Sequence, residues 1–334
     1  MITNKAEPRE AEDPSHGLNL RVPCYTSLDE GKIGECLDRD QFFWLDISMP
    51  SKDDVMALGR IFGFHPLALE DTLHFGQRPK LDDYGDYVYL VFYGAREHTE
   101  HHDDAPVREV HFYISGSYVI SLHRDHLPIL ENERQRMDGR VMHSEQFVIY
   151  RVLDALTDSF FPQLAAIDDE IDEIEDAVIT VADQAQLQRI FDLKRDLVAM
   201  RKVITPQRDL FARSVDAISE LPGLTLDARD YFRDVYDHLI RISDLIDSYR
   251  DLLSGAMDVY LSTVANRQNE VMKQLAIIAT IFLPLTFLTG FFGQNFGFLV
   301  NHITGEARFL IIGIGSLAIS CGILWYFFKR KRWL

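Results

Sequence analysis

Two uncharged apolar runs near the end of the chain dominate its pattern of hydrophobic and polar positions. They cover residues 274–293 and 309–328, and neither contains Asp, Glu, Lys or Arg. A helix of about twenty apolar residues is long enough to cross the ~30 Å hydrocarbon core of a bilayer. A buried helix of a soluble protein is the alternative for one run, but two runs in succession favour a pair of transmembrane helices.

The first third of the chain has a mixed pattern. Four stretches rich in β-branched and aromatic residues predict strands: 42–48, 87–95, 109–115 and 118–123. The Ser-Gly-Ser at 115–117 predicts a hairpin turn between the last two. Residues 51–63 and 65–73 predict short helices, the first with Ser51 as its N-cap. We therefore expect an α/β domain at 21–140.

From about residue 144 the pattern becomes helical. An apolar stripe at 4-3-4 spacing lies among acidic residues: Ile167, Ile171, Ile174 and Val178. Asp183 is a candidate N-cap for a second helix, antiparallel to the first. The predicted element is a helical hairpin at 141–225.

A third helical pattern continues into the first apolar run. It extends from about Leu226 to Gly290 with only Gly255 as an interruption, and one helix over 226–293 would be ~100 Å long. Pro284 lies inside the run, where a membrane helix tolerates proline and can bend. This pattern predicts one rod that joins the preceding domain to the bilayer.

Charges beside the apolar runs predict the orientation in the membrane. The tail 329–334 holds four consecutive Lys and Arg residues, whereas the loop 294–308 holds one Arg and no Lys. Positive charge favours the cytoplasmic side, so we expect both termini in the cytoplasm, the loop outside and the chain in the inner cell membrane. Residues 1–20 are polar and acidic without a signal-peptide core, and are expected to be disordered.

The composition narrows the function further. The chain has 34 Lys and Arg against 52 Asp and Glu, a formal net charge of -18, which argues against nucleic acid as a partner. The acidic balance is compatible with cation binding but equally with a solvated surface. The sequence has no phosphate-binding loop, zinc-protease motif or nucleophile elbow, so no enzyme activity and no NTP-driven transport are predicted.

Residues 98–104 form the one local cluster with metal-ligand chemistry. Its candidate zinc ligands are His98, His101, His102 and Asp103. The cluster lies between two predicted strands, so the favoured alternative is a solvated hairpin tip.

Two helices in one chain cannot enclose a water-filled path, so an ion pathway requires several copies around an axis. The first apolar run carries a small or weakly polar stripe at three- and four-residue steps: Asn269, Met272, Ala276, Ala279, Thr280, Leu283, Thr286 and Gly290. The stripe predicts a pore-lining face. A helix-packing face without a pore is the alternative that the spacing leaves open.

Four stretches resemble the CorA family of magnesium channels, in the wider group with a Gly-x-Asn signature. The most specific is YLSTVANRQNEVMKQLAIIATIFLPLTFLTGFFGQNF at 260–296, and the others are 65–93, 236–262 and the final KRKRWL. The resemblance implies a funnel-shaped homopentamer with a cytoplasmic α/β domain, a long pore helix and an outer transmembrane helix. It also implies transport of Mg²⁺, often with Co²⁺ and Ni²⁺, and a zinc-transporting branch shares the fold.

The signature implies the selectivity filter. Gly293 and Asn295 match the family pattern, while Gln294 stands where the family usually has methionine. A ring of Asn295 amides would present uncharged carbonyl oxygens to a hydrated Mg²⁺, which loses its water reluctantly. Gln294 puts the choice of ion in doubt, but not the resemblance to a channel.

Further positions match residues with family roles. The pore line is matched by Asn269, Met272, Leu275, Leu283 and Thr286, with Met272 and Leu283 as hydrophobic constrictions and Asp258 near the cytoplasmic mouth. The resemblance implies a regulatory Mg²⁺ between Asp71 of one subunit and Asp234 of the next. Glu70 and, less securely, Asp158 match ligands of a second regulatory ion.

Three functions remain open from the sequence. The first is a passive Mg²⁺ channel closed by cytoplasmic Mg²⁺, and the second is a Zn²⁺ transporter of the same fold, which can be proton-coupled. The third is a membrane-anchored scaffold whose acidic helices bind a partner. Only the third predicts that Asn295 is dispensable, and the specificity of the signature argues against it.

Overall fold

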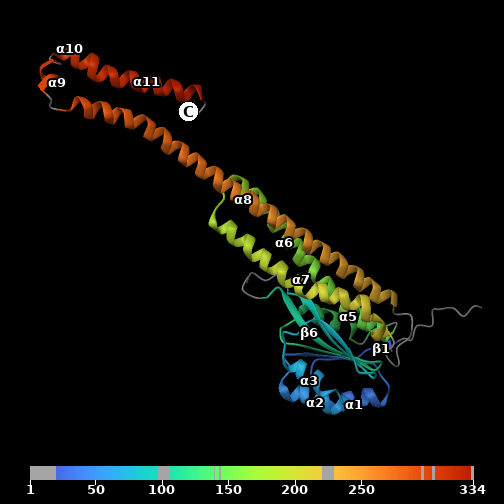
Figure 1. Cartoon of the computed structure of the whole chain (residues 1–334). Helices are drawn as coiled ribbons and strands as arrows, with labels where there is room; N and C mark the ends of the chain where they lie inside the picture. The colour runs from blue at the N-terminus through green and yellow to red at the C-terminus, as the bar shows by residue number, and fades with distance from the viewer. Residues whose placement is uncertain are drawn as a thin grey trace, which may run out of the picture. The chain divides into compact units, whose positions relative to one another are not determined.

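The computed structural model describes residues 20–96, 105–138, 140–142, 144–219, 229–294, 297–302 and 305–331 (Figure 1). The chain divides into two compact units. The first unit comprises Met1–Ala177 and Asp183–Met257, and the second comprises Val178–Ala182 and Asp258–Leu334. The strands are β1 (Leu20–Arg21), β2 (Cys24–Tyr25), β3 (Phe43–Ser48), β4 (Lys80–Asp83), β5 (Val88–Ala95), β6 (Val107–Ile114), β7 (Tyr118–His123) and β8 (Val141–Met142).

The helices fall into short and long groups. The shorter ones in the first unit are α1 (Glu30–Asp38), α2 (Lys52–Phe62), α3 (Pro66–Leu73), α4 (Pro128–Met137) and α5 (Glu145–Asp158). The long ones are α6 (Phe160–Thr180), α7 (Gln184–Ser219) and α8 (Arg229–Phe292). The last elements are α9 (Gly297–His302), α10 (Glu306–Arg308), the π-helical η2 (Phe309–Ile314) and α11 (Gly315–Arg330).

A six-stranded mixed sheet forms the centre of the first unit, in the order β2-β3-β7-β6-β5-β4. β3 runs parallel to β2 and β7, and the other neighbours are antiparallel. The predicted turn between β6 and β7 is confirmed, because the Ser115 amide donates to the Tyr118 carbonyl at 2.9 Å. All four predicted strands are present, and every residue of β5 and β7 is buried.

Helices cover both faces of this sheet, with α1, α2 and α3 on one side and α5 and α7 on the other (Figure 1). Alternate strand residues point to opposite layers. Tyr113 of β6 stacks on Phe64 after α2 at 3.9 Å between ring centroids, while Phe92 of β5 packs against Phe211 of α7. The layers bury a continuous aromatic and aliphatic core.

Local capping explains where the predicted helices begin. Ser51 accepts from the Asp54 amide, and the Asp54 side chain accepts in return from the Ser51 amide, so the predicted N-cap of α2 is confirmed as a capping box. Gly63 ends α2 with φ 71°, a left-handed conformation that glycine adopts readily. At the start of α7, the Asp183 carboxylate accepts from the Gln186 amide at 2.9 Å, as predicted.

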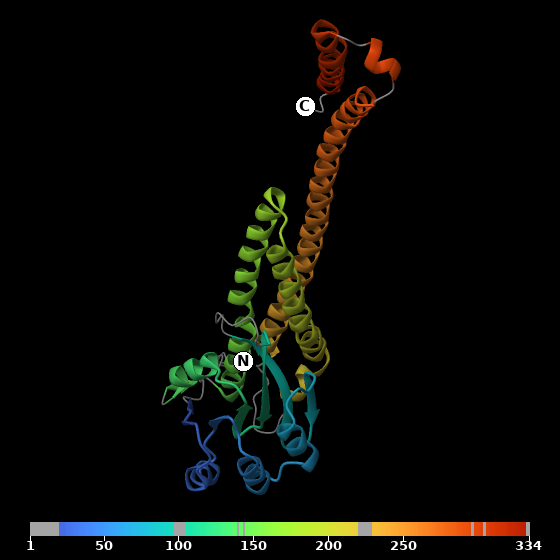
Figure 2. The ribbon, with the colours of Figure 1, turned by 90° about the vertical axis from the view of Figure 1, so that its left-hand side faces the viewer.

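Helices α6 and α7 run antiparallel, as Figure 2 shows. The predicted apolar stripe of α6 is buried, with Ile171, Ile174 and Val178 fully inaccessible to solvent. Arg189 of α7 donates to Glu170 and Glu173 of α6, each at 2.9 Å. The hairpin is thus held by an apolar seam with ion pairs beside it.

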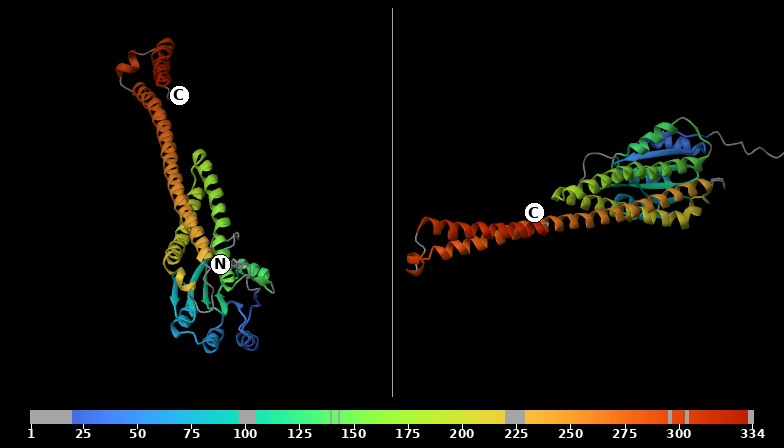
Figure 3. Two further views of the ribbon diagram at one scale, coloured as in Figure 1. Left: turned by 90° about the vertical axis from the view of Figure 1, so that its right-hand side faces the viewer. Right: turned by 90° about the horizontal axis from the view of Figure 1, so that it is seen from above.

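The predicted long helix is a single element of 64 residues, α8, with Pro284 inside it. Its rise of about 1.5 Å per residue gives a length of ~96 Å. Two helical segments, Asp230–Phe292 and Glu306–Arg330, are long and apolar enough to cross a membrane. In the second unit, α11 runs back in the direction opposite to the last part of α8 (Figure 3).

Some elements were not predicted. The described residues of 141–225 form three helices, because α5 precedes the hairpin and only Ser159 separates α5 from α6. The short strand β4 pairs with β5, although Lys80–Asp83 is mostly polar and lacks the β-branched pattern of the other strands. Helices α1 and α4 are mostly polar in sequence, and their few buried residues give a weak helical period.

Candidate ion pathway and metal sites

The predicted pore-lining residues lie on one face of α8. At about 100° per residue, Asp258, Asn269, Met272, Leu275, Leu283 and Thr286 fall within an arc of ~120°. All six are exposed in the single chain. Met272 and Leu283 are 58% and 74% exposed, which is unusual for large apolar side chains in a folded protein.

The hydroxyl groups on this part of α8 are satisfied by their own helix. Thr280, Thr286 and Thr289 each donate to the carbonyl four residues earlier, at 2.7 to 2.9 Å. Such internal bonds let a hydroxyl lie in an apolar environment without an outside partner. Between Gln274 and Phe292, α8 therefore presents apolar and weakly polar groups without charge, whereas Asp258 lies nearer the start of the predicted pore face.

The signature turn starts where α8 ends. The Gly293 amide donates to the Thr289 carbonyl at 2.9 Å, and the Gln294 amide donates to the Phe291 carbonyl at 3.3 Å. A Cβ at Gly293 would lie 3.1 Å from the Thr289 carbonyl oxygen, closer than an ordinary contact. Glycine is thus favoured here by this close approach. Gln294 is exposed, and the predicted filter residue Asn295 lies outside the described residues.

A cluster of three carboxylates and one imidazole lies between α5 and α8. His238 Nδ1 is 3.0 Å from Asp158 Oδ1 and 3.5 Å from Asp154 Oδ1. His238 Nε2 is 3.8 Å from Asp234 Oδ1. Ligand atoms of Asp154, Asp234 and His238 all lie within 4.8 Å of one another, so one metal ion could contact all three. We call these four residues the α5–α8 cluster.

Two helices position the α5–α8 cluster by the same spacing. Asp154 and Asp158 are one turn apart on α5, as are Asp234 and His238 on α8. The Tyr150 hydroxyl donates to Asp234 Oδ2 at 2.9 Å, and the Phe161 ring meets the His238 ring edge-on. Among the described residues, the buried atoms Asp154 Oδ1 and His238 Nδ1 make these ion-pair contacts but no hydrogen bond of good geometry. Such atoms are suited to a cation.

The electrostatics of the α5–α8 cluster favour a bound cation. Burial, and then the charge of Asp158, raise the pKa of Asp154 from 3.8 to about 6. Burial also raises the pKa of Asp158, against the lowering effect of His238. Neighbouring carboxylates raise each other's pKa, because their negative charges repel. A divalent ion between them offsets this repulsion and favours the ionised form of both.

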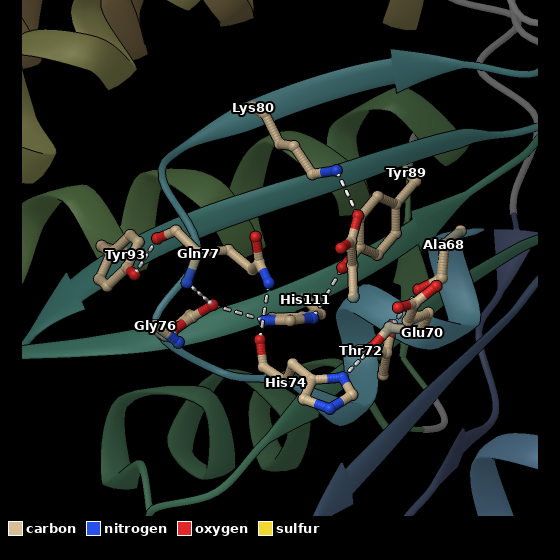
Figure 4. Close-up of polar contacts among 12 residues, drawn as sticks. Ala68, Glu70, Thr72, His74, Gly76, Gln77, Lys80, Tyr89, Tyr93 and His111 are labelled. Carbon is tan, nitrogen blue, oxygen red and sulfur yellow. Dashed lines mark hydrogen bonds and ion pairs between the residues drawn. The ribbon is translucent and has the colours of Figure 1, made fainter.

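Asp71 and Glu70 lie on α3, which is fixed to the sheet. The Thr72 hydroxyl is 2.8 Å from the Tyr113 hydroxyl of β6. At the end of α3, the Glu70 carbonyl is 2.8 Å from His74 Nδ1 (Figure 4). The Glu70 side chain is exposed. α3 therefore presents two adjacent carboxylates of different exposure from a rigid support.

Asp71 has a cation partner within the chain. Lys80 Nζ lies 2.6 Å from Asp71 Oδ2 and 2.8 Å from Asp82 Oδ2. Burial alone would lower the pKa of Lys80, but the hydrogen bonds to Asp71 and Asp82 raise it above its usual value. Figure 4 shows Lys80 reaching over the ring of Tyr89, 5.2 Å from its centroid. Asp71 is thus neutralised by a permanently charged neighbour.

The predicted regulatory residues fall into two separate groups in one chain. Asp158 and Asp234 come together around His238. Asp71 and Glu70 lie on α3, and Asp71 contacts Lys80 of β4. The predicted pairing of Asp71 with Asp234 concerns two subunits and stays a prediction. The histidine cluster at 98–104 lies outside the described residues.

Sequence reasoning missed Asp154, His238 and Lys80. The i, i+4 pairs Asp154–Asp158 and Asp234–His238 were a usable signal, because each pair lies on one helix face. What the sequence could not supply is that α5 and α8, about eighty residues apart, face each other. Lys80 gave no signal, because β4 was not predicted.

Comparisons with known proteins agree on one family. A family model described as CorA-like Mg²⁺ transporter protein matches residues 39–330. The chain is 35% identical over 296 residues to the cobalt/magnesium transport protein CorA of Thermotoga maritima, with coverage of 87% of this chain and 83% of the relative. It is also 26% identical over 258 residues to the zinc transport protein ZntB of Yersinia enterocolitica, covering 77% of each.

A solved structure has the same fold. The complete CorA magnesium transporter from Methanocaldococcus jannaschii matches with a TM-score of 0.74 at 23% identity, over 87% of this chain and 91% of that one. At this identity the likeness concerns the fold alone. It extends over the α/β domain, the long helices and the C-terminal helix.

Proposed function

The chain belongs to the CorA-like Mg²⁺ transporter family, and we propose that it is a passive channel for Mg²⁺, and also for Co²⁺ and Ni²⁺, that closes when cytoplasmic Mg²⁺ binds between subunits. Members of this family are transporters, in agreement with the absence of catalytic motifs from the sequence. The observation that carries the proposal is α8. This one continuous helix contains Asp234 near its start, the predicted pore face, and the signature turn at its end.

Several copies are needed to make a path for the ion, and we propose a homopentamer in the inner membrane. Its support is the exposed apolar surface that α8 carries outside the predicted pore face and that a lone chain would leave uncovered: Ile278, Phe282 and Phe287. Lipid and neighbouring copies of α8 would cover this surface. The small and weakly polar face would then line the pore, with Met272 and Leu283 as its narrow apolar rings.

We further propose that both termini are cytoplasmic. The support is the charge asymmetry between the basic residues after α11 and the loop before it. An epitope near His302 should then be accessible on intact cells, and a reporter fused after Leu334 should not be. The reverse labelling would place the signature turn on the cytoplasmic side and overturn the proposed filter.

The filter is proposed to be Gly293, Gln294 and Asn295. The close approach of the Thr289 carbonyl at Gly293 supports a specific turn at this place. Uncharged amide oxygens suit a hydrated ion, because a carboxylate ring would bind Mg²⁺ more tightly and slow its release. Gln294 adds a second side-chain amide at a position where the usual family signature has the thioether of methionine.

The gate is proposed to respond to one Mg²⁺ held by Asp71 of one subunit and Asp234 of the next, and to a second ion held by Glu70 and Asp158. The α5–α8 cluster supports this role, since its carboxylates repel one another and two buried ligand atoms lack hydrogen bonds. Each chain carries a formal charge of -18, so neighbouring subunits repel until divalent ions bridge them. When the ions leave, the first part of α8 is released and its motion reaches Met272.

Transport is proposed to need only the electrochemical gradient. Moving two charges inward through ~100 mV releases ~4.6 kcal/mol, which favours accumulation by about a thousandfold or more. Uptake into polarised proteoliposomes should therefore proceed without nucleotide and slow on depolarisation. Uptake that required ATP would contradict a passive channel.

A Zn²⁺ transporter is the second candidate. Two observations favour it: the similarity to ZntB, and the imidazole of His238 within the α5–α8 cluster, since nitrogen suits Zn²⁺ better than Mg²⁺. The deciding experiment measures flux of Mg²⁺, Co²⁺, Ni²⁺ and Zn²⁺ into liposomes with a pH probe inside. Mg²⁺ flux without a pH change supports the channel, and Zn²⁺ flux with proton movement supports the alternative.

A further inference from the structure

The ammonium group of Lys80 is paired with the carboxylate of Asp71, which the proposed regulatory ion needs as a ligand. Its Nζ atom lies 2.6 Å from Asp71 Oδ2, which is the distance of a direct charge-assisted hydrogen bond. We propose that Lys80 is a built-in competitor of the regulatory Mg²⁺, so that the ion must displace this ammonium group from Asp71 before the pore closes. The inference rests on the proposed role of Asp71, and it assigns to Lys80 the setting of the Mg²⁺ concentration at which closure occurs.

The fold keeps the competitor beside Asp71. Lys80 begins β4 and pairs with Val91 of β5, so its backbone is held by the sheet. Asp71 lies on α3, which Thr72 joins to Tyr113 of the same sheet. Because both residues are held by one rigid layer, the ammonium group has a high effective concentration at Asp71 whether or not a divalent ion is present.

The Lys80 ammonium group has two further partners that remain available when it leaves Asp71. Its ammonium lies 2.8 Å from Asp82 Oδ2 and over the ring of Tyr89, as Figure 4 shows for the tyrosine. When Mg²⁺ takes Asp71, the ammonium can stay with Asp82 and the aromatic face. Displacement therefore leaves no unpaired charge, which makes the competition moderate and reversible.

The two halves of the proposed regulatory site thus differ in their resting state. In the α5–α8 cluster, carboxylates face one another and a cation relieves their repulsion. At α3, the carboxylate is already neutralised. Binding of Mg²⁺ at the first half is promoted by its electrostatics, whereas binding at the second half is opposed by Lys80.

The size of the effect follows from the exposure of the pair. The Lys80 and Asp71 side chains are 32% and 29% exposed, so water and salt screen part of their attraction. Ion pairs near the surface typically change an equilibrium by about 1.4- to 5-fold. Removal of the Lys80 charge should lower the Mg²⁺ concentration for half-maximal closure by this factor.

The test is a cycle of four full-length proteins: wild type, Lys80→Met, Asp71→Asn and the double variant. In each, Mg²⁺ alone is titrated, and two midpoints are recorded: protection of the cytoplasmic region from protease, and inhibition of Mg²⁺ current. Lys80→Met should lower both midpoints by about 1.4- to 5-fold. In the Asp71→Asn background the same substitution should have no such effect, because the contested carboxylate is gone.

Two controls separate the competition from general effects. Lys32→Met removes the same charge from a surface pair of the same domain, where Lys32 lies 3.5 Å from Asp29, and should leave the midpoints unchanged. Lys80→Gln replaces Lys80→Met if the latter misfolds. The proposed competition is refuted if Lys80→Met and Lys80→Gln both leave the Mg²⁺ midpoint unchanged or raise it, while Asp71→Asn still raises it. A wild-type midpoint in Asp71→Asn overturns the proposed role of Asp71 itself, and with it the inference.

Discussion

The two parts of α8 follow different rules of burial, although they form one uninterrupted helix. Before Met257, one face of the helix is packed inside the chain, and Phe232, Leu239 and Leu253 on it are fully buried, while Leu252 is exposed. After Asp258, large apolar side chains are exposed, with Leu283 at 74% and Phe287 at 70%. The difference teaches that burial within one chain accounts for the first part only. The second part needs a cover from outside the chain, which the proposed function supplies as lipid and further copies.

The chemistry of the two parts differs in the same way. The first part contributes Asp234 and His238 to a charged cluster that can hold an ion. The second part is uncharged over its apolar run and ends in an amide-bearing turn. Charged ligands hold a divalent ion for sensing, whereas uncharged ligands let it pass. This contrast agrees with the proposal that the first part serves regulation and the second part conduction.

The largest expected effect is at the end of the second part. Asn295→Ala should reduce Mg²⁺ flux to background while the protein still assembles, because it removes the proposed ring of amide oxygens. Gln294→Met is the matched control and should conduct, since methionine is the usual residue there. Flux into proteoliposomes and size-exclusion chromatography measure both properties. Near-normal flux in Asn295→Ala would remove the filter from this turn.

A matched pair of leucines tests the burial contrast directly. Leu239→Ala should lower the free energy of unfolding of the first compact unit by about 2–5 kcal/mol, because it leaves a cavity in a fully buried site. Leu283→Ala, on the same helix but 74% exposed in the chain, should leave that free energy unchanged and alter conductance instead. Denaturant titration followed by the fluorescence of Trp44, which is buried in the first unit, gives this free energy. Equal destabilisation by both substitutions would refute the division of α8.

A smaller effect is expected from pH. The pKa of Asp154 is raised from 3.8 to about 6, mainly by burial and by Asp158. Mg²⁺ binds the ionised carboxylate, so protonation of Asp154 should weaken Mg²⁺ binding. When the pH is lowered from about 7 to about 5, the Mg²⁺ concentration for half-maximal protection from protease should rise, by up to ~10-fold for each pH unit below the pKa. Asp154→Asn should flatten this dependence, and His238→Asn controls for the imidazole that faces the same carboxylate.

The same shift predicts the opposite trend for stability without Mg²⁺. The pKa of Asp154 is higher in the folded chain than its ordinary value, so protonation favours the folded state. Its contribution is fully present below about pH 3.8 and is lost as the pH rises through about 6. The ion-free protein should thus gain stability from this residue on acidification while its Mg²⁺ affinity falls. Asp154→Asn should remove that gain.

Local sequence signals predicted much of the fold. The strands, the Ser51 capping box, the apolar stripe of α6 and the long helix were all visible, because each depends on residues near one another in the chain. β4 was missed because its pairing with β5, rather than its own composition, makes it a strand. The family signature, rather than periodicity, located Asn295.

The candidate metal site was only half predictable. Asp158 and Asp234 were named by resemblance, but their approach through His238 depends on the packing of α5 against the start of α8. The same holds for Asp154, whose pKa is raised by that packing. A contact between helices distant in sequence leaves no local sequence pattern, because it arises only from their packing in the folded chain.

The most direct test of a channel closed by its own ion is a recording of Mg²⁺ current through the reconstituted protein while Mg²⁺ on the cytoplasmic side is raised. Wild type should lose current as Mg²⁺ rises. The Asp71→Ala, Asp234→Ala double variant should keep conducting over the same range, because the proposed bridge between subunits is gone. Inhibition of the double variant with the same Mg²⁺ dependence as wild type would contradict the account, as would the absence of any Mg²⁺ current in the wild-type protein.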